Sequence, residues 1–254
     1  MKLKRMLGLL AGLLVTASAT AQMQVDMTPA TGALKGGARK VVTTVFTAEM
    51  RGGKIVKTGK PDPWGEIGVY PQEAVQTYDS NGQLIAMSTT ADGVETRYEY
   101  KYADGRLTEE SRYDGGTLFS VRHYLYEAGK PAGMSEDMFI GGEKTTNDYP
   151  VDASKIKTDA AGNTIEYGYS QNDFVKRDKA GRLVEFSMYN EMDDYVEART
   201  YTYDAQGRVT KIAVSEGAVL TYTYDKTDAQ GNWTRLIIRS DNAVIGGAER
   251  TITY

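Results

Sequence analysis

The chain has 254 residues, a formal net charge of −4 at pH 7 and no cysteine. The lack of cysteine excludes disulfides, thiolate metal ligands, cysteine nucleophiles and a lipid-modified cysteine. The acidic balance argues against nucleic acid or an anionic membrane as a partner. Leucine, isoleucine, valine and phenylalanine are scarce enough to suggest disorder, but 18 tyrosines can supply the missing buried area. We therefore expect a folded chain with a tyrosine-rich core.

Residues 1–21 have the pattern of a removable signal peptide. Basic residues at the start precede a short apolar run over residues 6–15, and Ala19-Thr20-Ala21 supplies the small residues of a cleavage site. The apolar run is too short to cross a bilayer. We expect cleavage after Ala21, no membrane insertion, and a chain that is periplasmic or secreted.

The region before residue 75 is expected to form a lead-in and an N-terminal cap. Residues 22–39 are polar, glycine-rich and without period, which predicts a flexible lead-in. Residues 40–50 are rich in β-branched side chains, and residues 54–58 can return as their hairpin partner. Residues 59–71 carry three of the six prolines, which favours a loop or an edge segment. Residues 40–74 are thus expected to be a capping hairpin followed by a proline-rich loop.

A repeated strand–turn–strand unit organises residues 75–254. Its clearest copy is RTYTYDAQGRVTKIAV over residues 199–214. Tyr201 and Tyr203 are two residues apart, so they share one face of a strand. Asp204 can cap a tight turn through its carboxylate, and Gly207 at the fourth position accepts the positive φ that such a turn requires.

The same pairing of aspartate and glycine recurs along the chain. We expect structural turns at Asp79 and Gly82, Asp159 and Gly162, Asp178 and Gly181, Asp204 and Gly207, and Asp228 and Gly231. The last four glycines are spaced 19 to 26 residues apart, which fits one hairpin and its connection per repeat. Residues 131–154 break this rhythm with proline, glycine and aspartate, and we interpret them as an insertion. The pattern predicts an all-β fold: an antiparallel β-meander of tandem hairpins forming one elongated, curved sheet or solenoid.

The unit Tyr-x-Tyr-Asp-x-x-Gly-Arg-[Leu/Val] resembles the YD repeat of bacterial RHS proteins. Its best copies are YTYDAQGRVTKIA (201–213) and YTYDKTDAQGNWTRLI (222–237), and partial copies are RDKAGRLVEFSMY (177–189) and YDSNGQLIA (78–86). The C-terminal ending ERTITY is similar to that of small exported YD-repeat proteins. In large RHS proteins such repeats wind a sheet into a shell around a toxin domain. The resemblance implies a sheet-building role here and, at the level of the family, carbohydrate binding.

Acidic residues suggest two metal sites, and a structural interpretation is favoured for both. The repeated turn aspartates could bind calcium, but each turn offers a single carboxylate and the calcium-binding nonapeptide pattern is missing. The densest acidic cluster, at Glu191, Asp193, Asp194 and Glu197, is typical of a solvated connection between strands. We therefore predict no metal site and no cofactor.

The remaining candidates are aromatic residues and one histidine. His123 is the only histidine and lies in an alternating strand pattern, while no nucleophile motif surrounds any serine, so no catalytic residue is predicted. Most tyrosines should pair across strands, but Tyr98 and Tyr100 together with Trp64 could form a flat stacking platform for sugars or a partner protein. Trp233 follows a turn glycine by two residues and is expected in the core.

These observations favour a non-enzymatic exported β-repeat module that binds or scaffolds in the cell envelope or outside the cell. Its expected partner is a glycan or an envelope protein. The alternative is a glycan-active hydrolase whose carboxylate pair is assembled only in the fold, because separation in space cannot be seen in the sequence.

Overall fold

The computed structural model describes residues 34–60, 72–167, 174–190, 195–215, 217 and 219–254. These residues form β-strands and one three-residue 3-10 turn, so the expected all-β fold is confirmed. The expected signal peptide, most of the expected lead-in and Trp64 lie outside the described residues. No helix in the described part of the chain has the length and hydropathy to cross a membrane.

Eighteen strands form a single sheet in which every pairing is antiparallel. The first nine are β1 (Lys40–Arg51), β2 (Lys54–Gly59), β3 (Glu73–Tyr78), β4 (Leu84–Ala91), β5 (Val94–Ala103), β6 (Arg106–Asp114), β7 (Thr117–Glu127), β8 (Lys130–Ile140) and β9 (Glu143–Pro150). The 3-10 turn η2 (Ala153–Lys155) follows. The others are β10 (Ile156–Thr158), β11 (Thr164–Tyr167), β12 (Phe174–Arg177), β13 (Leu183–Asn190), β14 (Tyr195–Tyr203), β15 (Val209–Val214), β16 (Val219–Thr227), β17 (Trp233–Ser240) and β18 (Ala243–Thr253).

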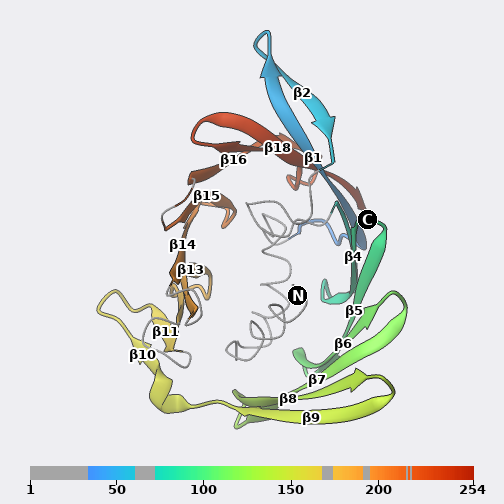
Figure 1. Cartoon of the computed structure of the whole chain (residues 1–254), viewed down its shortest axis with the longest axis vertical. Coiled ribbons are helices and arrows are strands. Elements are labelled where there is room, and N and C mark those ends of the chain that lie inside the picture. The colour runs from blue at the N-terminus through green and yellow to red at the C-terminus, as the bar shows by residue number, and fades with distance from the viewer. Residues whose placement is uncertain (1–33, 61–71, 168–173, 191–194, 216, 218) are drawn as a thin grey trace.

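Strand β1 is the junction of two meanders and not a cap at the end of the sheet. One edge of β1 pairs with β18 over Lys40–Thr47, and its other edge pairs with β3 over Lys40–Thr44 and with β2 over Thr47–Arg51. Consecutive hairpins run from β3 to β9 and from β10 to β18. The prediction that the hairpin in residues 40–74 caps one end of the sheet is therefore wrong, because β18, the last strand of the chain, pairs with β1. Figure 1 shows the two meanders curving from β1 toward each other to form an arch.

The strands at the two ends of the arch run in the same direction, because the path between them contains an odd number of strands. Within the part of the chain that the structure describes, β2 pairs with β1 alone, which leaves seventeen of the eighteen strands in the path from β9 through β1 to β10. Directions alternate along an antiparallel path, so the strands at its two ends run the same way. An antiparallel ladder cannot join them. No ladder connects β9 to β10 in the described residues, and the sheet has two free ends.

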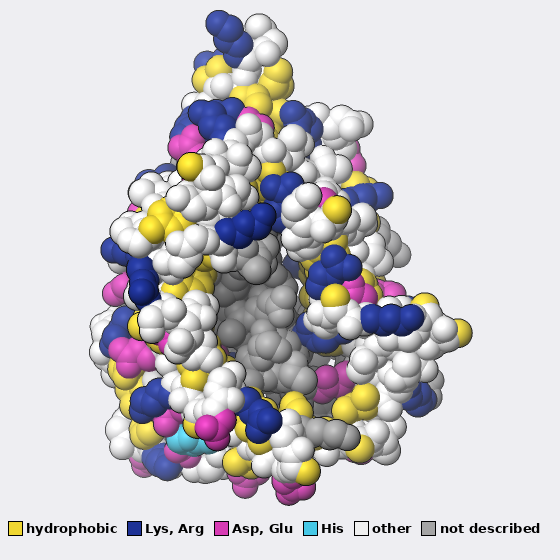
Figure 2. Space-filling model, turned by 180° about the vertical axis from the view of Figure 1, so that it is seen from behind, with side chains coloured by type: hydrophobic (Ala, Val, Ile, Leu, Met, Phe, Trp, Pro, Cys, Tyr) yellow, Lys and Arg dark blue, Asp and Glu magenta, His cyan; other side chains and the backbone are white. Residues whose placement is uncertain are grey.

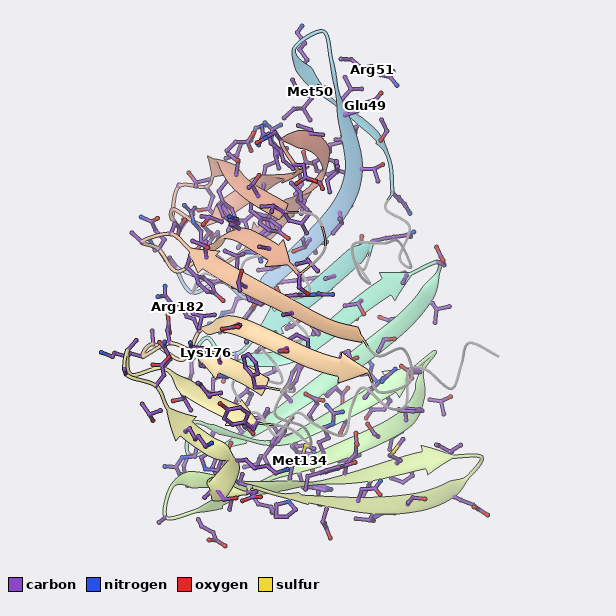
Figure 3. The ribbon with its side chains drawn as sticks, turned by 60° about the vertical axis from the view of Figure 1, so that its left-hand side comes forward. Glu49, Met50, Arg51, Met134, Lys176 and Arg182 are labelled. Carbon is purple, nitrogen blue, oxygen red and sulfur yellow. The ribbon has the colours of Figure 1, made fainter. Side chains whose placement is uncertain are left out.

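The hairpin of β1 and β2 projects beyond the rest of the sheet. Figure 3 shows Glu49, Met50 and Arg51 at its far end. The Met50 side chain is 51% exposed and lies opposite Ile55, which is also exposed. The hairpin thus carries an apolar pair on a two-stranded ribbon that has no further strand beside it in the described residues.

The Asp-x-x-Gly turns share one geometry. In the copy at residues 204–207, the Gly207 amide donates to the Asp204 carbonyl at 3.0 Å, and Gly207 has a φ of +78°. Asp204 Oδ1 accepts from the amides of Gln206 and Arg208, both at 2.9 Å. The carboxylate therefore satisfies amides that the turn would otherwise leave to water. The same pair of amide bonds is made by Asp79, Asp159, Asp178 and Asp228.

We expect Gly207→Ala to lower the free energy of unfolding by about 1 kcal/mol, and Gly207→Val by more. A Cβ at Gly207 would meet nothing closer than the Arg182 guanidinium at 4.0 Å, so the cost comes from the backbone angle and not from a clash. Asp204→Ala should cost about 1 kcal/mol through its lost hydrogen bonds. Urea midpoints measured beside Ala205→Ser, which should be neutral, test this. A Gly207→Val protein as stable as Ala205→Ser would contradict the turn geometry.

The second tyrosine of each unit ties one hairpin to the next. Tyr203 Oη donates to the carbonyl of Leu183 at 2.6 Å, and Tyr224 Oη donates to that of Val209 at 2.8 Å. Each acceptor stands two residues after a turn glycine. Tyr102 and Tyr126 make the same bond to Leu84 and Leu107. Burial raises the pKa of Tyr102 to about 12, so the bonding proton stays on the hydroxyl.

The arginine after the turn glycine completes this link. The Arg182 guanidinium stands 4.8 Å from the centre of the Tyr203 ring, and Arg208 stands 4.4 Å from that of Tyr224. Arg208 also donates through Nε to Asp204 at 2.7 Å. Tyrosine, aspartate, glycine and arginine of the motif therefore all serve the joint between consecutive hairpins.

The core consists of clusters spread along the sheet. One joins Val45, Val209, Leu220, Tyr222, Trp233, Leu236, Ile238 and Ala248 around the β1 junction. Another joins Met87, Tyr98, Tyr100, Leu107, Tyr124 and Met134 across β4 to β8. Figure 3 shows Met134 on the side of the sheet that faces the middle of the arch. We call this side of β5 to β8 the concave face.

Residues 131–154 continue the repeat sheet instead of interrupting it. They supply most of β8 and all of β9, which pair with β7 and with each other. Pro131 is the second residue of β8 and Pro150 is the last of β9. Proline is tolerated at strand ends and on an edge strand, because no central ladder needs its missing N–H. The prolines that suggested an insertion therefore mark strand ends.

Candidate functional site

Tyr98 and Tyr100 do not form an exposed stacking platform. Their side chains are 8% and 4% exposed and belong to the core cluster on the concave face. Strand alternation correctly places the two rings on one face, but that face is the buried one. Their expected companion, Trp64, lies outside the described residues. Trp233 is 3% exposed and lies in the core cluster at the β1 junction.

A row of charged side chains lies beside Tyr100 on the concave face. Tyr100, Glu110, Arg122 and Glu136 are direct cross-strand neighbours on β5, β6, β7 and β8. Arg122 donates through Nη1 to Glu110 Oε1 at 3.1 Å and through Nε to Glu136 Oε1 at 2.9 Å. Glu110, Arg122 and Glu136 are 2%, 6% and 5% exposed. We call these three residues the buried ionic row.

The charges of the buried ionic row depend on one another. Burial raises the pKa of Glu110, and the Arg122 guanidinium acts in the opposite direction. Burial alone would lower the pKa of Arg122, but the Glu110 and Glu136 carboxylates outweigh it and hold that pKa above its usual value. Two carboxylates share one guanidinium, so each glutamate has an oxygen committed to Arg122. This geometry suits a structural joint across β6, β7 and β8 better than an acid–base pair.

The convex face of the same strands carries a second row of ionisable side chains, which is only partly exposed. The His123 ring lies between two carboxylates, with Nδ1 3.8 Å from Glu109 Oε2 and Nε2 3.5 Å from Asp137 Oδ2. Asp137 accepts from Thr146 Oγ1 at 2.7 Å and contacts Lys144 Nζ at 2.9 Å. These bonds hold the pKa of Asp137 down at about 2. His123 is thus a strand residue beside two partly or largely buried carboxylates.

The turn aspartates that the sequence suggests as possible calcium ligands are bound to the turns themselves. The carboxylate oxygens of the turn aspartates accept hydrogen bonds from the turn backbone. Those of Asp178 and Asp204 also accept from the side chain of the arginine that follows the turn. No group of histidine, aspartate and glutamate side chains within the described residues is arranged to hold a metal ion. Glu191, Asp193 and Asp194 lie outside those residues, as does the side chain of Glu197.

One carboxyl group should make stability depend on pH. Glu166 on β11 lies between Ile156 and Val175 of the neighbouring strands, and burial raises its pKa from 4.5 to about 7 against the opposing charge of Arg177. The folded state therefore holds this proton more tightly than the unfolded state. The raised pKa of Glu166 therefore stabilises the folded state fully below about pH 4.5, and this stabilisation is lost as the pH rises through about 7.

We expect Glu166→Gln to remove this pH dependence. The variant should match the wild type at about pH 4 and exceed its free energy of unfolding by up to about 3 kcal/mol at about pH 8. Urea denaturation at both pH values measures the difference. Glu185→Gln on β13, which is separated from β11 by β12, is the matched control: Lys176 approaches its carboxylate at 4.0 Å, and the variant should show no such gain. A constant difference between Glu166→Gln and wild type at both pH values would contradict the burial of an ionisable group.

Comparisons with known proteins place the repeat in a family. The RHS repeat model matches residues 78–118, from the end of β3 to the start of β7. This match confirms the resemblance read from the tyrosine and aspartate motif. No curated protein shows a significant match to the chain.

Three solved structures show weak likeness. A porin-like protein from Bacteroides uniformis ATCC 8492 is 12% identical, with a TM-score of 0.42 over 87% of this chain and 98% of that one. The TcdB2-TccC3-Cdc42 structure is 17% identical, with a TM-score of 0.20 over 68% of this chain and 12% of that one. The Tc holotoxin pore of Photorhabdus luminescens is 13% identical, with a TM-score of 0.18 over 73% and 16%. By its match at residues 78–118, this chain carries an RHS repeat.

Proposed function

We propose that the chain is a non-enzymatic exported β-repeat module that binds or scaffolds in the cell envelope or outside the cell. The observation that carries this proposal is the use of the motif residues. Tyr203, Asp204, Gly207 and Arg208 are committed to turns and to joints between hairpins. A repeat of this kind builds surface, and function then resides in what the surface contacts.

The carboxylates of the concave face support a binding role over the hydrolase alternative. A glycosidase needs one carboxyl group that donates a proton and one that acts as base or nucleophile. Glu110 and Glu136 are the buried pair here, and both contact the same guanidinium. On the face shown in Figure 2, side chains of both signs are interspersed. Such a surface suits a glycan or an envelope protein better than a polyanion.

A glycan screen that records binding and turnover in parallel tests this proposal. We expect binding to at least one glycan or envelope fraction without release of product. Turnover that is lost in Glu110→Gln or Glu136→Gln, with the circular dichroism spectrum unchanged, would establish the hydrolase instead.

Export is tested separately. The full chain produced in a bacterium with an outer membrane should appear in the periplasm or the medium with Gln22 as its first residue. An intact N-terminus in the cytoplasm would contradict export.

A further inference from the structure

Strand β9 is a free edge of the sheet. It pairs with β8 over its whole length, Glu143 to Pro150, and with no other strand in the described residues. Figure 1 shows β9 at the margin of the arch with no labelled strand beyond it. Its side chains from Glu143 to Thr146 are exposed. A strand in this position presents a second row of backbone N–H and C=O groups that can pair with another strand.

The strand at the other end of the arch, β10, is not a suitable partner for β9. Strand β10 has three residues, whereas β9 has eight. The odd number of strands in the arch also makes β10 run parallel to β9, while every ladder of the sheet is antiparallel. Among the strands that the structure describes, none is therefore left that could pair antiparallel with β9 over its eight residues.

We propose that β9 pairs antiparallel with β9 of a second copy of this chain, which continues the sheet across a two-fold axis. In the proposed register, Thr146 of one copy lies directly opposite Thr146 of the other. Lys144 of each copy then faces Asp148 of the other, so the dimer gains two opposite-charge pairs on one face. On the other face, Glu143 meets Tyr149 and Thr145 meets Asn147, which are pairs that can hydrogen-bond. A symmetric interface of this type closes after two copies.

The charges of β9 select this register over its neighbours. If one copy is shifted by one residue in one direction, Glu143 of each copy lies opposite Asp148 of the other. This register places like charges opposite each other at two positions. A shift in the other direction sets Lys144 against Tyr149 and Glu143 against Pro150, and no opposite-charge pair remains. Lys144, Thr146 and Asp148 share the convex face, where Thr146 and Lys144 already contact Asp137. The Lys144 side chain is 54% exposed, and its ammonium lies 2.9 Å from Asp137 of its own chain, so a contact with Asp148 of the second copy would add to this ion pair.

A single cysteine in this cysteine-free chain tests the register. Directly opposite residues have Cα atoms about 4.5 to 5.5 Å apart, within the range that a disulfide spans. Thr146→Cys should therefore form a covalent dimer under mild oxidation. Thr145→Cys is the matched control, because its two copies would be diagonal neighbours about 7 to 8 Å apart and should cross-link at least tenfold more slowly. Equal rates for the two variants, or no cross-link with Thr146→Cys, would overturn the proposed pairing.

Charge reversal gives a second test that does not depend on cysteine. Lys144→Glu should weaken the dimer about tenfold in sedimentation equilibrium, because two opposite-charge pairs become like-charge pairs. The double variant Lys144→Glu with Asp148→Lys should restore the wild-type association. A wild-type chain that stays monomeric, or a double variant as weak as Lys144→Glu, would overturn the proposal. Association that requires a different protein would also overturn it, since the partner would not be a second copy.

Discussion

Gly247→Ala should lower the free energy of unfolding by about 3 kcal/mol or more. Gly247 lies on β18 between Phe46 of β1 and Ile237 of β17, so it occupies the junction of the two meanders. A Cβ there would stand 2.3 Å from the carbonyl oxygen of Leu236 and 2.7 Å from the Phe46 ring. The carbonyl belongs to the sheet backbone and cannot move aside without breaking the ladder. Opening this junction would separate the two arms of the arch.

Gly59→Ala is the matched control for this prediction. Gly59 is also a strand glycine, and the nearest atom to its added Cβ is Thr47 Oγ1 at 3.6 Å, an ordinary contact. Its urea midpoint should stay close to the wild-type value, while that of Gly247→Ala should fall sharply. Equal midpoints for the two variants would mean that β1, β17 and β18 do not pack as closely as described.

The local part of the fold was open to prediction from sequence because its causes are local. A turn such as Asp204 to Gly207 is specified by a carboxylate that bonds two amides within four residues and by a glycine at positive φ. Tyrosine alternation then predicts which side chains share a face. Both signals act within about ten residues, and they predicted hairpins, turns and the antiparallel meander.

The joining of the two meanders depends on contacts that no local signal contains. Lys40 pairs with Thr253 and also with Thr77, and nothing in the β-branched run over residues 40–50 marks it as central instead of terminal. Alternation also leaves open which face is buried. For that reason the sequence suggests Tyr98 and Tyr100 for an exposed platform, whereas both side chains are buried in the structure.

The buried ionic row escaped prediction because its residues look like surface residues. Glu110 and Glu136 lie 26 positions apart, and only the strand register brings both to Arg122. One signal was present: Arg122 is two residues from Tyr124, so a tyrosine on the core face implies an arginine on the same face. A buried arginine in turn requires carboxylates on the neighbouring strands.

Arg122→Met should destabilise the chain by about 3 to 5 kcal/mol at neutral pH. The change keeps an unbranched, flexible side chain that reaches as far as the arginine Nε, but it leaves Glu110 and Glu136 buried without their shared cation. A carboxylate that loses its counter-charge in a buried site costs far more than the original pair contributed. Lys101→Met on the exposed side of β5 removes one of the charged neighbours of Glu109 and should leave the urea midpoint almost unchanged.

The pH dependence distinguishes a lost ion pair from poor packing of the new methionine. Burial already raises the pKa of Glu110 in the wild type, and removing Arg122 removes the charge that opposes this rise. The folded variant will therefore take up protons at a higher pH than the unfolded chain. A group with a raised folded pKa contributes stability below its unfolded pKa and loses it as the pH rises. The deficit of Arg122→Met should consequently shrink toward about pH 4 and grow above it, whereas a packing defect would stay constant with pH.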